Sequence, residues 1–180
     1  VYLSPAPLYH SAPLGFTTGT QSVGGTAVVL EKFDPLEALQ AIERYGVTHS
    51  QWVPTMFTRM LKLTEEERNR WDLSTHKVAI HAAAPCPVEV KKQMLEWWGP
   101  ILHEYYAGTE LNGFCYVGPE DWISHPGTVG KPLIGTLRIC DEDGTELPTG
   151  ESGLIYFERE EQTFEYHQAP DKTKSSQHPN

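Results

Sequence analysis

The middle of the chain alternates helical and strand-like patterns, and this alternation limits the fold more than any other feature. Three short apolar runs have the length and composition of buried strands: 47–53, 77–82 and 101–106. Three amphipathic stretches that precede or separate them have helical spacing: 35–45, 55–63 and 87–98. Strands that alternate with helices favour a parallel sheet with crossover helices. We therefore predict an α/β fold built on a parallel sheet.

Local signals mark two helix starts. Asp34 precedes the helix predicted at 35–45 and can accept its first backbone N–H groups, and Gly46 follows as a terminator. Thr64 and Glu67 have the spacing of a capping box, which predicts the start of a short acidic helix.

A different pattern begins after about residue 112. Residues 136–140 alternate with period two, 141–144 have turn composition, and 154–157 can form a partner strand. This pattern predicts an antiparallel, barrel-like portion beside the parallel sheet. The expected organisation is an α/β subdomain, an antiparallel portion and a loop-like tail, at residues 1–112, 113–160 and 161–180.

Composition argues against several classes of partner. The formal net charge is −10, whereas sequence-independent binding to nucleic acid needs a basic surface. No basic stretch suggests a lipid anchor, and no apolar run reaches the roughly 18 residues of a membrane-spanning helix. The sequence leaves open a peripheral membrane contact of the parent protein, and its oligomeric state.

The cysteines and histidines do not form recognisable metal or disulfide patterns. Three widely spaced cysteines are typical of reduced thiols, and we expect a cytoplasmic protein: Cys86, Cys115 and Cys140. Eight histidines are present, but their spacing does not match a zinc site.

Two predicted strand ends carry the residues with the most distinctive chemistry, and ligands of open parallel sheets bind beyond such ends. After the strand at 77–82, small residues let a flat ring approach the backbone, and Pro85 fixes the turn. On this segment alone, an ordinary strand-to-helix loop is the favoured interpretation.

The second strand end follows residues 101–106. Tyr106 can stack on a base, the Thr109 hydroxyl can bond a phosphate oxygen, and the Glu110 carboxylate can hold Mg²⁺, which prefers oxygen ligands. The alternative is a helix that Thr109 caps, with Glu110 in its first turn.

Five segments, in this order, resemble motifs of the adenylate-forming superfamily, which includes acyl-CoA synthetases, luciferases and peptide-synthetase adenylation domains. They are residues 7–10, 81–85, 106–110, 127–132 and 150–155. The family motifs read Pro-Leu-Phe-His, Gly-Gly-Ala-Pro, Tyr-Gly-X-Thr-Glu, Gly-Ser-Val-Gly-Lys-Pro and Gly-Glu-X-Gly-Glu-Leu. The residues around His10 and at 158–180 are most similar to those of the fatty-acyl-CoA synthetases.

The resemblance implies a nucleotide and acyl site. It assigns cofactor-binding roles to seven residues: Ala83, Ala84, Pro85, Tyr105, Tyr106, Ala107 and Thr109. Within that set Thr109 would contact the α-phosphate, while Glu110 would coordinate Mg²⁺. His10 would lie at the wall between the acyl and nucleotide sites, and Gly108 would face the acyl carboxylate. The implied catalytic residues are Thr109, Glu110 and His10.

The implied reaction has two steps. A carboxylic acid, expected to be a fatty acid, attacks the α-phosphate of ATP to give acyl-adenylate and pyrophosphate, and CoA thiolate then displaces AMP. The expected partners are therefore the acid, ATP, Mg²⁺ and CoA. Two alternatives stay open: a non-catalytic module that binds adenylate or acyl ligands or a partner protein, and a member of the superfamily that activates aryl or amino acids.

The match to the family is incomplete. Ala82, Ala83 and Ala107 stand where the family motifs have glycine, and each added methyl narrows the backbone approach. The Lys-containing phosphate loop, the Thr-Gly-Asp motif and the C-terminal domain with its Lys are not found in the 180 residues. We therefore expect an internal fragment of the large N-terminal domain that is inactive alone.

Overall fold

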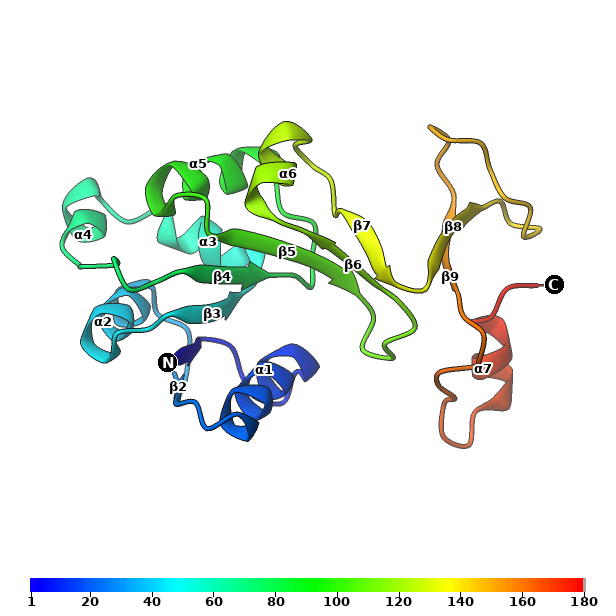
Figure 1. The fold of residues 1–180 in the computed structure, drawn as a ribbon, viewed down its shortest axis with the longest axis horizontal. Helices are drawn as coiled ribbons and strands as arrows, with labels where there is room; N and C mark the ends of the chain where they lie inside the picture. Colours follow the sequence, from blue (N-terminus) through cyan, green and yellow to red (C-terminus); the bar gives the residue numbers. More distant parts are fainter. Residues whose placement is uncertain (180) are drawn as a thin grey trace. The chain divides into compact units, whose positions relative to one another are not determined.

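The computed structural model describes residues 1–179 and has a mixed α/β fold (Figure 1). The chain forms two compact units. The first comprises Val1–Tyr105 and Val117–Gly130, and the second comprises Tyr106–Tyr116 and the residues from Lys131 onward.

The first unit is built on five parallel strands in the order β2-β1-β3-β4-β5. Their bounds are Tyr2–Ser4 for β1, Ala27–Val29 for β2, His49–Trp52 for β3, Val78–His81 for β4 and Leu102–Ala107 for β5. Helices connect consecutive strands, so the predicted parallel sheet with crossover helices is confirmed. The chain runs from β1 to β2 on one side and then to β3 on the other, so the strand order reverses at β1.

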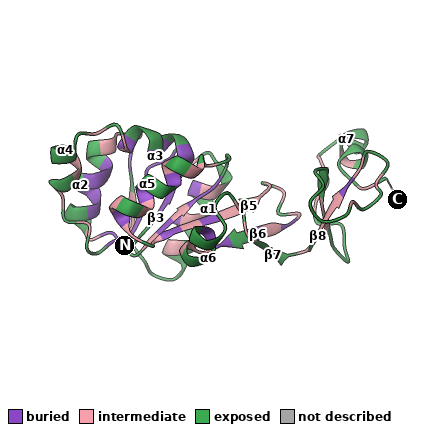
Figure 2. Ribbon diagram, turned by 90° about the horizontal axis from the view of Figure 1, so that it is seen from above, coloured by how far each residue is buried: buried purple, intermediate pink, exposed green. Residues whose placement is uncertain are grey.

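Six helices belong to this unit: α1 (Ser11–Ser22), α2 (Pro35–Tyr45), α3 (Pro54–Met60), α4 (Glu65–Asn69), α5 (Val88–Trp98) and α6 (Pro119–Ser124). The three helices predicted from amphipathic spacing are α2, α3 and α5, and their buried faces are visible in Figure 2. Neither β2 nor α6 was predicted, and both are short, with three and six residues.

The predicted helix boundaries have the expected chemistry. The Asp34 side chain accepts hydrogen bonds from two backbone N–H groups of α2, each at 3.0 Å, and Gly46 ends that helix in the left-handed conformation. Thr64 and Glu67 form the reciprocal capping box at the start of α4.

The two faces of the sheet are covered by different helices. Leu3 of β1 is fully buried in the main core together with residues of α2, α3 and α5. Tyr2, the preceding residue, points to the opposite face and lies against Phe16 of α1, with 6.2 Å between ring centroids. The opposite face is therefore the one on which α1 packs.

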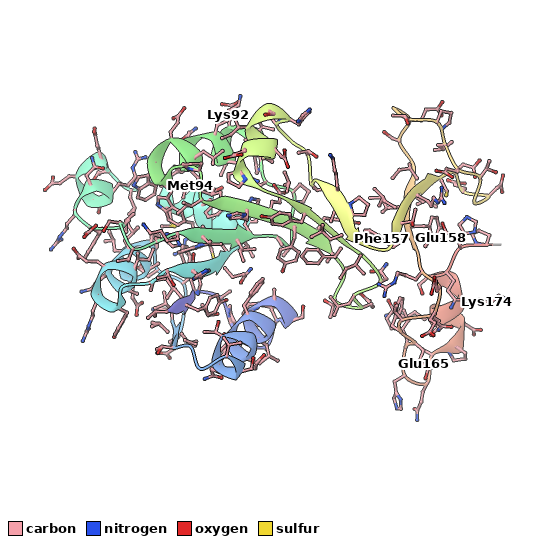
Figure 3. All side chains as sticks on the ribbon, viewed as in Figure 1. Lys92, Met94, Phe157, Glu158, Glu165 and Lys174 are labelled. Carbon is pink, nitrogen blue, oxygen red and sulfur yellow. The ribbon has the colours of Figure 1, made fainter. Side chains whose placement is uncertain are left out.

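Aromatic side chains fill the centre of the main core. The Trp52 ring of β3 lies 5.2 Å from that of Trp98 and 6.1 Å from that of Phe57, centroid to centroid. Met94 of α5 is fully buried in the same cluster, whereas Lys92 on that helix points to solvent (Figure 3). The helical spacing of α5 thus separates a buried face from an exposed one.

The second unit is antiparallel. Strand β6 (Phe114–Val117) pairs with β7 (Lys131–Ile134), and β8 (Thr136–Cys140) pairs with β9 (Leu154–Glu158). The β8–β9 pair was predicted from period-two alternation. The tail, expected to be a loop, contains a short helix, α7 (Pro170–Ser175), which begins with a proline in its first turn.

Among residues 1–179, none of the helices combines the length and the apolar composition that crossing a membrane requires.

Candidate functional site

The loop that follows β4 carries three of the predicted nucleotide-binding residues, Ala83, Ala84 and Pro85. All three are exposed. Ala83 has a positive φ of 76°, a conformation that glycine adopts readily and alanine does not. The chain therefore keeps a left-handed backbone at a position where the family motif has glycine.

The two predicted loops leave neighbouring strands of the first unit. His81, at the end of β4, lies opposite Glu104 of β5 in the parallel register. The loop at 82–87 and the segment after Glu104 consequently start side by side, as expected for a site at the carboxyl end of a parallel sheet.

His10 lies in the connection that follows β1. It precedes the first residue of α1 and is exposed, and its ring lies 4.4 Å from the Tyr9 ring. Since β1 is the strand at which the order reverses, His10 follows the point where ligands of such sheets bind. Sequence spacing alone could not show this, because strand order depends on the tertiary pairing.

Tyr105 of β5 points to the face covered by α1. Its ring lies 6.3 Å from that of Phe16, which also contacts Tyr2. Burial raises the pKa of the Tyr105 hydroxyl, so the side chain is neutral at physiological pH. An aromatic row from β1 through α1 to β5 holds this tyrosine in place.

In the second unit, Thr109 and Glu110 are the central residues of a tight turn. The Leu111 N–H donates to the Gly108 carbonyl at 3.1 Å, and Leu111 has a positive φ of 54°. No helix begins at Thr109, so the alternative of a helix cap there is wrong. The turn presents a hydroxyl and a carboxylate from adjacent positions.

The Glu110 carboxylate has a partner that the sequence did not reveal. The Tyr166 hydroxyl donates to Glu110 Oε1 at 2.8 Å, and Lys172 Nζ of α7 lies 4.0 Å from the centroid of the Tyr166 ring. The hydrogen bond from Tyr166 holds the pKa of Glu110 below its usual value. Glu110 is therefore an oriented, ionised carboxylate.

Two glycines in and beside this turn are closely surrounded by side chains. A Cβ atom at Gly108 would lie 3.0 Å from Glu110 Oε2 and 3.1 Å from Asn112 Oδ1, so these two oxygen atoms lie close to the Gly108 backbone. A Cβ at Gly113 would overlap the ring of Phe157. Close packing against Phe157 therefore requires glycine at position 113.

Tyr106 also belongs to the second unit. Its ring is partly exposed and lies 6.3 Å from that of Phe157 at an interplanar angle of 26°. Phe157 belongs to β9, about 50 residues further along the chain, and packs against the Tyr106 ring. No local motif in the sequence indicated that Phe157 or Tyr166 would lie near Tyr106 and Glu110.

The Glu110 carboxylate and the Thr109 hydroxyl suit a site in which magnesium also binds a phosphate ligand. Among residues 1–179, no group of three His, Cys, Asp or Glu side chains could enclose a metal. Magnesium commonly uses one or two carboxylates together with water and substrate phosphates, so a single ionised carboxylate such as Glu110 is a suitable protein ligand.

Comparison with known proteins agrees with this chemistry. A family model described as AMP-binding enzyme matches residues 1–167. 4-Coumarate–CoA ligase-like 6 of Oryza sativa subsp. japonica is 31% identical over 161 residues, covering 87% of this chain and 26% of the relative. The medium/long-chain-fatty-acid–CoA ligase FadD8 of Mycobacterium tuberculosis is 31% identical over 157 residues, covering 86% of this chain and 27% of the relative.

Solved structures share the fold. O-succinylbenzoate coenzyme A synthetase of Bacillus subtilis, in complex with ATP and magnesium ion, matches with a TM-score of 0.71 and 26% identity over 86% of this chain. That match covers 31% of the solved chain. The 180 residues thus span about a quarter to a third of the length of these proteins.

Proposed function

Because the chain belongs to the AMP-binding enzyme family of adenylate-forming proteins, we propose that its parent protein is an ATP-dependent acid–CoA ligase. The parent would join a carboxylic acid to CoA through an acyl-adenylate. The observation that carries the proposal is the turn of residues 108–111, which lies within the residues that the family model matches. This turn presents the Thr109 hydroxyl and the ionised Glu110 carboxylate, which accepts a hydrogen bond from Tyr166.

We assign the binding roles as follows. The nucleotide contacts come from the loop after β4 and from the segment after Glu104: Ala83, Ala84, Pro85, Tyr105, Tyr106, Ala107 and Thr109. Their small size and planar rings suit a purine, and the Thr109 hydroxyl suits a phosphate oxygen. His10 and Gly108 contact the acyl group. These assignments rest on chemistry and on the family motifs.

The charge developed on phosphate during adenylation needs oriented groups rather than a protein nucleophile. Magnesium, when bound, supplies positive charge to the phosphate oxygens. Glu110 would hold that ion through its carboxylate, whose orientation is fixed by the hydrogen bond that the Tyr166 hydroxyl donates to Oε1. Thr109 contributes a hydrogen bond at the α-phosphate, and His10 helps to position the acid.

For the substrate we propose a fatty acid. One of the matched relatives is named for medium and long fatty acids and another resembles 4-coumarate ligases, so an aryl acid is the second candidate. Acid-dependent ATP–pyrophosphate exchange by the full-length parent, measured with fatty acids, 4-coumarate and amino acids, distinguishes them. The highest activity with 4-coumarate or an amino acid would overturn the fatty-acid assignment.

The second candidate function is a non-catalytic module that binds adenylate or acyl ligands or a partner protein. We expect the 180-residue chain alone to give no acid-dependent ATP–pyrophosphate exchange. Exchange by the isolated chain would refute this expectation. Absence of exchange by the full-length parent with any acid would favour the binding module.

The proposed role of Glu110 is tested with Glu110→Gln in the full-length parent. The amide has no negative charge and binds Mg²⁺ weakly, so we expect the magnesium concentration needed for half-maximal exchange to rise at least tenfold. Glu142→Gln, in the exposed turn after β8, is the matched control and should leave it unchanged. An unchanged magnesium requirement in Glu110→Gln contradicts the assignment.

A further inference from the structure

A buried ion pair lies in the first unit, outside the residues assigned above. Lys91 Nζ of α5 donates to Glu104 Oε2 of β5 at 2.6 Å, and His81 Nε2 of β4 lies 3.4 Å from the same oxygen. The side chains of Lys91 and His81 are fully buried, and that of Glu104 is 7% exposed. Lysine and glutamate are rarely buried to this extent unless they are paired.

The surroundings make the pair costly. Lys91 Nζ lies 4.7 Å from the centroid of the Trp122 ring of α6, and burial lowers the pKa of the Lys91 amine, an effect opposed by its hydrogen bond to Glu104. Burial also lowers the pKa of His81 to about 3, so His81 is neutral. Apolar residues of similar volume often stabilise a core as well as a buried ion pair does. Stability alone therefore does not explain these charges.

The contacts join both ends of one loop. His81 immediately precedes the loop at 82–87, and Lys91 follows it within the first turn of α5. Both side chains meet Glu104 Oε2. Glu104, in turn, directly precedes Tyr105. One carboxylate oxygen thus connects the strand before the loop, the helix after it and the strand that leads to the second nucleotide segment.

The loop between these anchors has a strained residue. Ala83 has a φ of 76°, a left-handed conformation that is strained for a residue other than glycine. Such conformations persist only where the surrounding structure holds them, and they cluster at ligand-binding segments. The anchors at both ends supply that restraint.

We propose that Lys91 and Glu104 are positioning residues that hold the loop at 82–87 in the shape that receives the nucleotide. They do not contact the ligand and act through the backbone of the loop. The inference rests on the proposed function, because it takes the nucleotide to bind this loop. It assigns a role in ATP affinity to two residues that no motif marks.

The test uses the full-length parent with both charges removed together, Lys91→Met with Glu104→Leu, because losing one partner leaves a buried charge unpaired. We expect the melting temperature to change by only a few degrees, the KM for ATP to rise at least fivefold, and kcat at saturating ATP to stay within twofold. If the double variant melts far lower, Lys91→Gln with Glu104→Gln replaces it. A KM for ATP that stays within twofold in the folded variant overturns the proposal.

The exposed pair on the same helix provides the matched control. Lys92 Nζ lies 3.1 Å from Glu89 Oε1, and both side chains face solvent. Lys92→Met with Glu89→Leu makes the same chemical change without touching Glu104, so the KM for ATP should stay at the wild-type value. An equal rise of KM in this control would show that losing any ion pair of α5 raises the KM, and would refute the positioning role.

A glycine at position 83 tests whether the rise in KM comes from the loop conformation or from altered core packing. In the Lys91→Met, Glu104→Leu background, Ala83→Gly removes the penalty on the positive φ and should lower the KM for ATP at least twofold. Equal KM values with and without Ala83→Gly contradict the mechanism.

Hydrogen exchange distinguishes failure of this inference from failure of the proposed function. The amides of residues 82–84 and of Cys86 should exchange faster in the double variant than in the wild type, whether or not the protein uses ATP. Faster exchange in a parent that has no ATP-dependent activity would support the restraint and refute the nucleotide role. Unchanged exchange would refute the restraint itself.

Discussion

Replacing Ala83 with glycine should stabilise the protein, although glycine is usually the less stable choice. The φ of 76° costs alanine roughly 1–2 kcal/mol, and glycine adopts it without a steric penalty. Glycine also gains roughly 0.4–1 kcal/mol of conformational freedom in the unfolded chain, which opposes the benefit. The difference predicts a net gain of about 0.5–1 kcal/mol in the free energy of unfolding.

Urea unfolding of the full-length parent, followed by tryptophan fluorescence, measures this gain. All five tryptophans of the 180 residues lie in the first unit, which contains the Ala83 loop. For a unit of this size, the expected rise in melting temperature is about 1–4 °C.

Ala84→Gly is the matched control one residue away. Ala84 has no positive φ, so glycine there brings only the entropic cost and should destabilise by about 0.4–1 kcal/mol. The opposite signs at two adjacent alanines are the signature of backbone strain. Destabilisation of similar size in both variants would show that Ala83 is not strained and would refute the reasoning.

Two further predictions concern titrating groups. Tyr166→Phe removes the hydroxyl that donates to Glu110 Oε1, so the pKa of the Glu110 carboxyl should rise toward its ordinary value. An NMR titration of the Glu110 side-chain carboxyl detects this rise, and an unchanged titration would contradict the hydrogen bond. Burial lowers the pKa of His76 from 6.5 to about 4, so the unfolded chain binds the extra proton between these values. Stability is therefore fully present above about pH 6.5 and falls by up to about 3 kcal/mol as the pH drops toward 4. His76→Gln should flatten the dependence of urea midpoints on pH in this window, and an equally steep dependence in the variant would exclude His76 as its source.

Helix boundaries were predictable because the chemistry that sets them is local. Asp34 and Gly46 enclose α2, and each acts on backbone groups within a few residues of itself. The same is true of the reciprocal bonds between Thr64 and Glu67. The alternation of these helices with short apolar strands was enough to predict the parallel sheet.

The conformation of Thr109 and Glu110 could not be predicted from the local sequence alone. A hydroxyl followed by a carboxylate suits a helix start and a phosphate-facing turn equally well, and the residues themselves do not choose. The hydrogen bond from Leu111 to Gly108 and the contact of Glu110 with Tyr166 select the turn. The second contact spans 56 positions in the chain, so no sequence window could contain it.

The class of fold and the caps of α2 and α4 could be predicted from the sequence, because periodicity and capping act over short distances. Motif spacing also led to the two segments for which nucleotide binding is proposed. The burial of Lys91 could not be predicted in this way. Lys91 and Lys92 are adjacent lysines on one helix, but Lys91 is buried against Glu104, whereas Lys92 is exposed and pairs with Glu89. Burial depends on which surface packs against the helix, and that is a property of the assembled sheet.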